Sequence, residues 1–387
     1  MTSIKDQFLL NSEITYLNHG SFGACPKPIF EDYQKWQLML ERDPVQFVTK
    51  TSLDHLKVSK QALAEYINCE PDDFVYVTNP STAGNIIIKG LDLKEGDEIL
   101  TTDHEYGAMD RTWNYVCRKN GAKYVRQPIS MPIQSKEAFL EEFWKGLSPK
   151  TKVVFISHIT SPTAVVFPVK EICQKAKELG LITFIDGAHA PGHVPLDLQE
   201  LEVDIYTGAC HKWLLTPKGS SFLYVRKELQ DRFDPLIISW GYEAEFPSHS
   251  QFLDYHEYQG TRDTAAFLTL PAAFQFRKDF EWDERTAKCR EMILHYYPEA
   301  CKILNTAPIC PLNSDFLGQL CSIPIKTTDA FQLKDLLFDQ YKIEIPLPKM
   351  DDHLFIRISI QGYNDDKDIE ILFDALRDIQ SKTSLIQ

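Results

Sequence analysis

Residues 181–226 read LITFIDGAHAPGHVPLDLQELEVDIYTGACHKWLLTPKGSSFLYVR and contain two short apolar runs that each end in polar residues. The first run, residues 181–185, is followed by Asp186, and the second, residues 204–209, ends shortly before Lys212. Runs of this length are typical of buried strands, and open α/β sheets bind ligands at the carboxyl ends of their strands. The stretch therefore predicts that a carboxylate and an amine meet at one edge of a sheet.

Asp186 and Lys212 together suit the chemistry of pyridoxal 5'-phosphate (PLP). A lysine carries the aldehyde of this cofactor as a Schiff base, and a carboxylate keeps the pyridine nitrogen protonated so that the ring accepts electrons. A lysine at a strand end among polar groups also loses some of its affinity for the proton. Lys218 competes for the role, but it follows Pro217 in a turn farther from the strand. We therefore expect Lys212 and Asp186 to be the catalytic pair.

The motifs around this pair resemble those of a known superfamily. The pattern D-G-A-H, followed about twenty residues later by H-K-W-L-x-x-P-K-G, is similar to that of the class V aminotransferase and cysteine desulfurase superfamily of fold-type I PLP enzymes. Residues 16–23 (YLNHGSFG) and 41–47 (ERDPVQF) most resemble the isopenicillin N epimerase-like branch, which also contains C–S lyases of ergothioneine synthesis. Matching motifs run from residue 16 to residue 364, so the resemblance covers essentially the whole chain.

The composition restricts the class of protein. The chain has 387 residues, 43% of them hydrophobic, and a net charge of -14, which disfavours nucleic acid or an anionic membrane as a partner. The N-terminus has no signal-peptide pattern and no stretch has the length of a membrane span, so we expect a cytoplasmic protein. Nine scattered cysteines without CxxC spacing indicate reduced thiols. Pro191 and Gly192 separate His189 from His193, so we expect no metal site.

The order of β-like and helical patterns predicts the fold. Strands at 74–78, 98–101 and 152–157 alternate with helical patterns, which is typical of a parallel, doubly wound α/β sheet. We expect a large PLP-binding domain over residues 51–275 and a smaller α+β domain over residues 276–387. Residues 1–50 are expected to pack with the small domain. The resemblance implies that the whole is a fold-type I PLP-dependent transferase.

Two strand ends are expected to hold the cofactor's phosphate and ring. The strand 74–78 leads through small residues into a helix, and helix N-termini bind anions, so Ser81, Thr82 and Ala83 are the expected phosphate cradle. Capping of the helix explains the same residues. In related enzymes an aromatic or imidazole side chain after the next strand stacks on the cofactor ring. Tyr106 aligns best with that role, and His104 is the alternative.

The resemblance implies further cofactor contacts. His189 is expected near the ring oxygen, and His211 resembles a phosphate contact in the desulfurase pattern. Gly260 and Thr261 look like the segment that reaches the phosphate of the neighbouring subunit. We therefore expect a homodimer in which the second subunit completes the active site. Arg262 is either a second anion contact or an ordinary surface arginine.

The substrate side is expected to include an arginine in the penultimate strand. Arg357 lies in an otherwise apolar run, where an unpaired charge is costly, and the family places the clamp for the substrate's α-carboxylate here. Asn18, His19 and Ser21 are expected on a glycine-containing loop over the site, and Ser161 or Thr163 is a weaker candidate. An edge-strand charge is the alternative role for Arg357.

These residues predict an enzyme that acts at the α-carbon of a small, amino-acid-like substrate, with Lys212 as the base. Reprotonation gives an epimer, loss of a β-sulfur group gives a C–S lyase, and protonation at the cofactor gives a class V aminotransferase. No cysteine lies between Cys321 and Arg357, which disfavours persulfide-forming desulfuration. We expect an isopenicillin N epimerase-like enzyme first and a C–S lyase acting on a cysteine conjugate or its sulfoxide second. A catalytically silent binding protein is a third hypothesis, disfavoured because Lys212 and Asp186 are both present.

Epimerisation needs a second proton donor besides Lys212. The sequence offers three candidates for this donor, Tyr106, His19 and His158. The residues alone do not choose between them.

Overall fold

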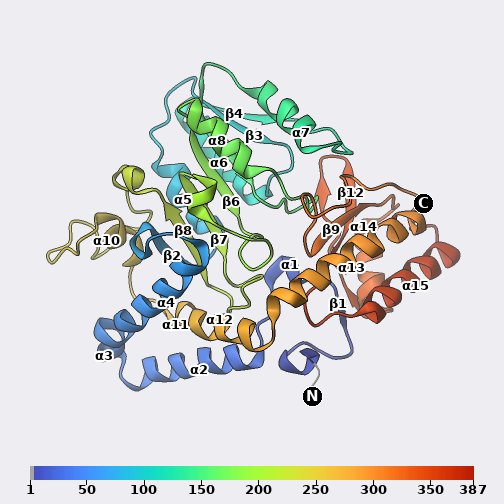
Figure 1. The fold of residues 1–387 in the computed structure, drawn as a ribbon, viewed down its shortest axis with the longest axis horizontal. Coiled ribbons are helices and arrows are strands. Elements are labelled where there is room, and N and C mark those ends of the chain that lie inside the picture. Colours follow the sequence, from blue (N-terminus) through green and yellow to red (C-terminus); the bar gives the residue numbers. More distant parts are fainter. Residues whose placement is uncertain (1–3) are drawn as a thin grey trace.

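The computed structural model describes residues 4–387, and a seven-stranded sheet lies at its centre (Figure 1). Its strands are β2 (Phe74–Val77), β3 (Glu98–Thr102), β4 (Lys123–Gln127), β5 (Thr151–Ser157), β6 (Ile182–Gly187), β7 (Ile205–Ala209) and β8 (Ser221–Val225). They lie in the order β2-β8-β7-β6-β5-β3-β4. Every pair from β7 to β4 is parallel, whereas β8 is antiparallel to both β7 and β2. The predicted α/β class with a mostly parallel sheet is confirmed.

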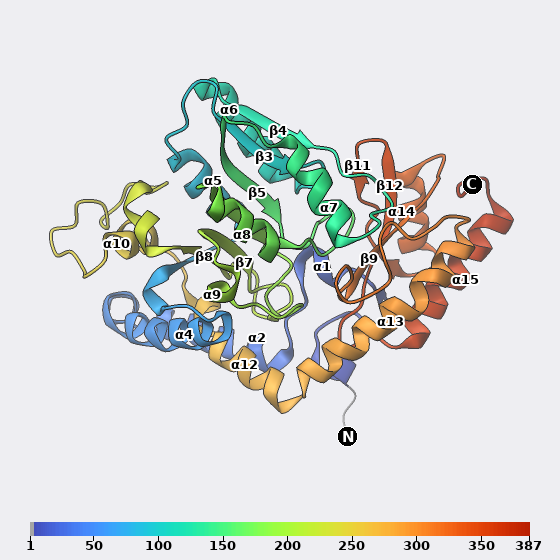
Figure 2. The ribbon, with the colours of Figure 1, turned by 45° about the horizontal axis from the view of Figure 1, so that its top comes forward.

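Helices cover both faces of this sheet (Figure 2). Successive side chains of a strand point to opposite faces, so Val153 and Phe155 of β5 join one apolar cluster and Val154 and Ile156 join another. Both faces are therefore covered by apolar side chains and shielded from water, as expected of a doubly wound sheet. The covering elements and their connections are α5 (Pro80–Gly90), α6 (Gly107–Asn120), α7 (Lys136–Phe143), η4 (Trp144–Gly146), α8 (Val169–Glu178), α9 (Leu198–Leu201), η5 (Lys227–Arg232) and α10 (Gln251–Glu257).

The C-terminal part forms a second, smaller unit around the antiparallel sheet β11-β12-β9. A long helix, α13, leads from the large sheet into this unit (Figures 1 and 2). The elements are α13 (Trp282–Ile303), β9 (Leu320–Pro324), α14 (Ala330–Asp339), β10 (Ile343–Glu344), β11 (Lys349–Met350), β12 (His353–Ser359) and α15 (Asp366–Lys382). The small sheet places Arg357 opposite Ser322 of β9, with its backbone inside the unit.

The N-terminal segment contacts both units. Its elements are η1 (Ile4–Gln7), β1 (Thr15–Tyr16), α1 (His19–Phe22), α2 (Lys27–Arg42), α3 (Pro44–Gln46), η2 (Phe47–Thr51), α4 (Ser52–Ile67) and η3 (Pro71–Asp73). Strand β1 pairs in parallel with β10, and Asn18 forms a bridge with Ser359 of β12. Helix α2 packs on α11 (Ala265–Leu268) and α12 (Leu270–Asp279). Residues 15–22 therefore lie between the two sheets.

Some local expectations were wrong. Residues 18–23 were expected as a loop, but residues 19–22 form the short helix α1. The apolar stretch from 265 to 279 forms two helices, α11 and α12, and not one, because Pro271 lacks an N–H and fits only the first turn of a new helix. Strand β4 was missed because it lies at the sheet edge and is only half buried, so its sequence KYVRQ is too polar for the apolar pattern.

Three structural properties bear on the class of protein. No helix within residues 4–387 is long and apolar enough to cross a membrane. In the same part of the chain, no group of three or more His, Cys, Asp or Glu side chains is arranged to hold a metal ion. All nine cysteines are free thiols.

Candidate active site

A cavity of about 410 Å³ opens where the carboxyl ends of the parallel strands face the C-terminal unit. Both Asp186 and Lys212 line this cavity. Its walls come from α1, the start of α5, the ends of β5, β6 and β7, and β12. They consist of Gly20, Ser21, Phe22, Asn79, Pro80, Ser81, Tyr106, Ser157, Ile159, Ser161, Asp186, Ala188, His189, His211, Lys212 and Arg357.

Asp186 lies at the end of β6, beside Ser157 in the register of β5. One carboxylate oxygen accepts a hydrogen bond from the backbone N–H of Ala188 at 3.0 Å. Burial raises the pKa of this carboxyl above its ordinary value, and the nearby Lys212 opposes that rise. Gly187 is required next to it, because a Cβ there would lie 2.1 Å from the ring of Tyr206. A positively charged group placed beside Asp186 in the cavity would therefore favour its ionised carboxylate form.

Lys212 lies in the turn after β7, and its amine is 3.2 Å from Nε2 of His189. Burial lowers the pKa of Lys212 to about 7, and repulsion from Arg357 adds to this effect. A large fraction of the amine is therefore neutral at physiological pH, as attack on a carbonyl requires. Nε2 of His19 donates to the backbone carbonyl of Lys212 at 3.0 Å, which holds the turn from the side of α1.

Lys218, the competing lysine, is placed differently. Its amine donates to the backbone carbonyl of Gly23 at 3.0 Å and does not line the cavity. Gly23 itself has a φ of +70°, and a Cβ there would lie 2.0 Å from the carbonyl oxygen of His211. Lys218 thus anchors the end of α1 against the lysine turn, and Lys212 is the lysine that shares a cavity with Asp186.

The tautomer of His189 follows from its neighbours. Trp213 Nε1, which can only donate, lies 3.4 Å from Nδ1 of His189. Burial lowers the pKa of His189 well below 6.5, so the ring is neutral and its single proton lies on Nε2. This N–H points to Lys212. His189 is therefore set to donate a hydrogen bond into the cavity, as predicted for a contact with the ring oxygen.

His211 and the start of α5 form the opposite end of the cavity. Nδ1 of His211 donates to the carbonyl of Ser220 at 2.9 Å, which leaves Nε2 without a proton. Burial lowers the pKa of His211 to about 4, and a phosphate beside it would raise that value. Ser81 lines the cavity. Asn79 caps α5, and its Oδ1 accepts a hydrogen bond from the N–H of Thr82 at 2.8 Å, while Ala83 is buried within the helix.

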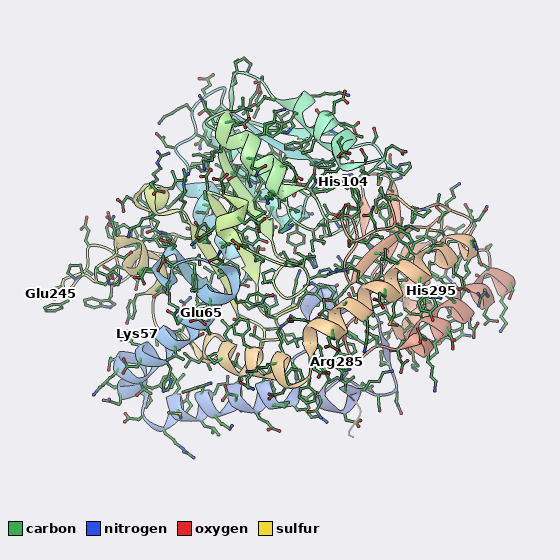
Figure 3. The ribbon with its side chains drawn as sticks, in the orientation of Figure 1. Lys57, Glu65, His104, Glu245, Arg285 and His295 are labelled. Carbon is green, nitrogen blue, oxygen red and sulfur yellow. The ribbon has the colours of Figure 1, made fainter. Side chains whose placement is uncertain are left out.

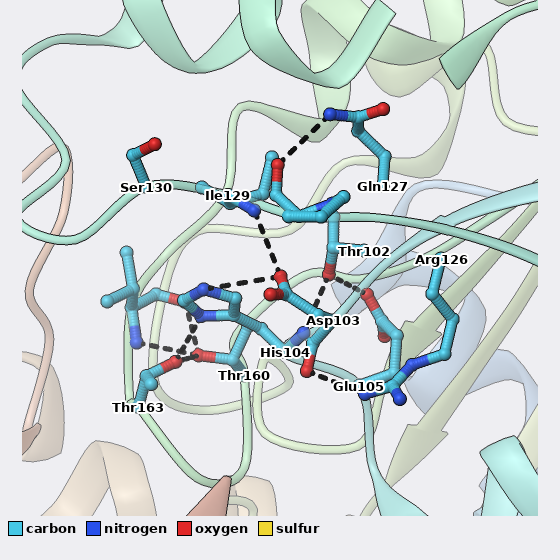
Figure 4. A network of polar contacts seen from close by, with 12 residues as sticks. Thr102, Asp103, His104, Glu105, Arg126, Gln127, Ile129, Ser130, Thr160 and Thr163 are labelled. Atoms are coloured by element: carbon cyan, nitrogen blue, oxygen red, sulfur yellow. Dashed lines mark hydrogen bonds and ion pairs between the residues drawn. The ribbon is translucent and has the colours of Figure 1, made fainter. Parts of the chain in front are cut away.

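Tyr106 and His104, the two candidates for stacking on the cofactor ring, differ in their position relative to the cavity. Tyr106 lines the cavity and is 45% exposed, whereas His104 is fully buried and does not line it. Nδ1 of His104 lies 2.8 Å from the hydroxyl of Thr163, which is 2.7 Å from that of Thr160 (Figure 4). Of the two candidates, Tyr106 alone is positioned to cover a ring in the cavity. His104 instead braces the loop that carries Ser161.

Arg357 projects from β12 into the cavity. Its Nη1 donates to the carbonyl and hydroxyl of Ser161 at 2.6 and 3.3 Å, and its Nη2 donates to Ser21 Oγ at 3.0 Å. Nε has no hydrogen-bond partner, and no carboxylate among the described residues forms an ion pair with this guanidinium. Burial lowers its pKa to about 10. A buried cation without a counter-ion is an anion site.

Asn18 and His19 support the site without lining it. Asn18 Oδ1 accepts from the Ser21 hydroxyl at 2.5 Å, and its amide donates to Glu344 Oε1 at 2.9 Å. His19 is fully buried between the lysine turn and Tyr363, whose hydroxyl is 3.0 Å from His19 Nδ1. Both residues therefore reach the cavity only through Ser21 and Lys212.

Thr261 lies away from this cavity. It lines a separate depression of about 660 Å³ between α4, α10 and the segment that precedes α11. Arg262 donates to the carbonyl of Glu257 at 3.0 Å and lies over the ring of Phe267. Within one chain, neither residue contributes to the site around Lys212.

Ser157 and Glu105 were not predicted from the sequence. Ser157 lines the cavity, and Glu105 lies buried behind it. One feature of the sequence could have identified Glu105, because it is an acid next to Tyr106 just after an apolar strand. No cysteine is among the residues that line this cavity.

Comparison with known proteins gives consistent results. The profile of the family described as aminotransferase class-V matches residues 29–372. Isopenicillin N epimerase of Amycolatopsis lactamdurans is 30% identical, over 97% of each chain. A probable chloroplastic L-cysteine desulfhydrase of Arabidopsis thaliana is 27% identical, over 93% of this chain and 82% of the relative. The solved complex of the cystine C–S lyase C-DES with cysteine persulfide is 25% identical, with a TM-score of 0.81 over 95% of this chain and 98% of that one.

Proposed function

Because the chain belongs to the aminotransferase class-V family of PLP-dependent enzymes, we propose that it binds PLP and acts at the α-carbon of an amino acid or short peptide, as an isopenicillin N epimerase-like enzyme. One observation carries the proposal. Asp186 and Lys212 of the stretch 181–226 and Arg357, far along the chain, line one cavity. A buried neutral amine, a buried acid and an unpaired guanidinium rarely coincide without a ligand that uses all three.

The described residues fit PLP. Lys212 would hold its aldehyde, Asp186 its ring nitrogen, His189 its ring oxygen, and Ser81 and His211 its phosphate. When bound, the cofactor withdraws the electrons released as a bond at the α-carbon breaks. Borohydride reduction of the purified protein followed by peptide mapping is the direct test. The cofactor mass should be found on the peptide that contains Lys212. A protein that takes up no PLP, or carries it on another lysine, would refute this assignment.

The protein's own groups divide the work on the substrate. Arg357 binds and orients the carboxylate, because its guanidinium lines the cavity and carries a charge that forms no ion pair among the described residues. The Lys212 amine, neutral for much of the time near pH 7, accepts the α-proton. His189 Nε2–H beside it keeps the amine oriented. Tyr106 and Phe22 supply the aromatic part of the cavity lining.

Epimerisation requires a donor that returns the proton on the other face. Of the three candidates from the sequence, Tyr106 lines the cavity, whereas His19 and His158 are buried outside it. The proposal therefore gives the second proton to the hydroxyl of Tyr106. Solvent deuterium should enter the α-position of the substrate without loss of the amino group, and Tyr106→Phe should slow this exchange.

The alternative is a C–S lyase on a cysteine conjugate or its sulfoxide. Desulfhydrase relatives and the lack of a cysteine in the cavity favour direct elimination over persulfide formation. Release of pyruvate together with a sulfur species would select this function. Transfer of the amino group to a keto acid would select an aminotransferase.

We also propose a homodimer in which Thr261 completes the partner's site. The segment between η5 and α10 projects from the fold, with Glu245 at its tip (Figure 3). This segment exposes large apolar side chains, including Ile238 (73%), Trp240 (80%) and Phe246 (88%), which is unusual for a free surface. Sedimentation should give twice the chain mass of 44.5 kDa. A monomer that is fully active would refute the shared site.

A further inference from the structure

Glu105 is a buried acid that the proposed chemistry does not use. It lies in the turn between β3 and α6, directly before Tyr106, and the whole residue is 5% exposed. Its Oε1 lies 2.7 Å from the hydroxyl of Thr102, the last residue of β3 (Figure 4). Its Oε2 lies 2.6 Å from the hydroxyl and 2.9 Å from the N–H of Ser157, the last residue of β5. One side chain thus joins the ends of two neighbouring strands.

Those two strand ends hold parts of the cofactor site. Tyr106 follows Glu105 and lines the cavity, as does Ser157. Ser157 is also the register partner of Asp186 on β6. A displacement of the Glu105 side chain would therefore move the Tyr106 ring and the neighbour of Asp186 together.

Two acids, Asp110 of α6 and Asp186 of β6, raise the pKa of Glu105 by charge repulsion, and the phenol of Tyr124 on β4 also faces it. Arg126 of β4 lies 3.8 Å from Asp110 and is not an ion-pair partner of Glu105. No ion pair of Glu105 with a lysine, arginine or histidine exists within residues 4–387. Burial raises the pKa of Glu105 to about 8 despite the hydrogen bonds from Ser157 and Thr102. The carboxyl therefore keeps its proton near pH 7.

We propose that Glu105, as a neutral carboxylic acid, is a positioning residue that locks Tyr106 and Ser157 in place around the PLP ring. This inference rests on the proposed function. One oxygen accepts from Ser157 N–H and O–H, and the other lies at hydrogen-bonding distance from the Thr102 hydroxyl. Neutrality matters because a second anion beside Asp186 would compete for the single positive charge of the ring nitrogen.

The test compares Glu105→Gln with Glu105→Leu in the full-length protein. The Gln amide keeps an acceptor toward Ser157 and a polar partner for the Thr102 hydroxyl without any charge. We expect Glu105→Gln to keep the PLP dissociation constant within about threefold and the visible absorption maximum unchanged, whereas Glu105→Leu raises the constant at least about tenfold. Equal loss in both variants would show that the charge is needed. Unchanged binding in Glu105→Leu would show that the link is not needed. Either result overturns the proposal.

Thermal melts of the proteins as purified test the proton itself. The folded pKa of about 8 exceeds the ordinary value of 4.5, so the parent loses stability as pH rises from about 5 to about 8. Glu105→Gln lacks this loss. The melting temperature of the variant minus that of the parent should therefore increase as pH rises from about 5 to about 8. A constant difference would refute a neutral Glu105. The melts remain decisive if Glu105→Leu does not fold, and they require no cofactor, so a parent that binds no PLP would refute only the proposed function.

Discussion

Replacing Arg357 by methionine should have opposite effects on stability and on binding. In the protein without ligand, burial lowers the pKa of Arg357 from 12.5 to about 10. At 1.36 kcal/mol per pKa unit, the fold carries this charge at a cost of roughly 3 kcal/mol. Methionine keeps the apolar stem and removes the charge. The lost hydrogen bonds to Ser161 and Ser21 offset part of the gain, about 1 kcal/mol each. The variant should therefore unfold at the parent's urea concentration or above it.

Arg277→Met is the matched control. Arg277 is almost equally buried, at 8% exposed against 4% for Arg357, but its charge is paired. It donates to Asp283 at 2.7 Å and to the carbonyl of Trp213 at 3.2 Å. Its loss leaves the buried carbonyl without a donor and should cost about 1–3 kcal/mol. Urea titration followed by tryptophan fluorescence measures both variants under the same conditions.

Substrate binding should show the reverse order. Charge-assisted hydrogen bonds to a carboxylate contribute about 1.5–3 kcal/mol, so Arg357→Met should weaken binding of an amino acid by about 10-fold to 100-fold. Arg277→Met should leave this affinity near the parent's. The amino-acid-induced change in the cofactor's absorption provides the measurement. If Arg357→Met destabilises the ligand-free protein as much as Arg277→Met does, the guanidinium is not an uncompensated charge and the carboxylate site is misplaced.

Three further changes probe the same cavity. Competitive acetylation of the PLP-free protein should label Lys212 with a midpoint near pH 7, since burial lowers its pKa to about 7, and a midpoint near 10 would contradict its burial. Because the unfolded chain holds that proton up to about pH 10, stability should rise with pH between 7 and 10 in the parent and less steeply in Lys212→Met, as followed by thermal melts. Gly187→Ala should cost about 3 kcal/mol or more in urea titrations, because its Cβ would lie 2.1 Å from the buried ring of Tyr206, and a stable variant would show that β6 can shift. Tyr106→Ala should weaken PLP binding by about tenfold, while Tyr106→Phe should keep binding but slow deuterium exchange, and equal binding by both variants would rule out ring stacking.

Several parts of the site could be predicted from local sequence. Asp186 and Lys212 follow strands whose apolar composition makes them recognisable, and parallel strands bring their carboxyl ends to one edge. Arg357 could be singled out because a charge within an apolar strand is destabilising unless it binds a partner of opposite charge. Polar residues in short helices were harder. Residues 19–22 contain no helical apolar period, so α1 could not be distinguished from a loop.

Contacts between distant segments depend on the tertiary structure. The choice of Tyr106 over His104 required the fold, because adjacent polar residues in a turn point in different directions and only packing decides which one faces the cavity. Glu105 joins Ser157 across 52 residues of chain, and Arg357 joins Ser21 across 336. No local pattern encodes such pairs, since a hydroxyl has many possible partners until the backbone is folded.

The amino-acid sequence by itself determined the buried parallel strands of the sheet, the pair at its carboxyl edge and the family, because these depend on hydrophobic period and on motifs a few residues long. The tertiary structure decided which side chains line the cavity, which brace it and which protons they hold. Those properties follow from burial and from the loss of solvent around each charge, which exist only once distant segments pack together.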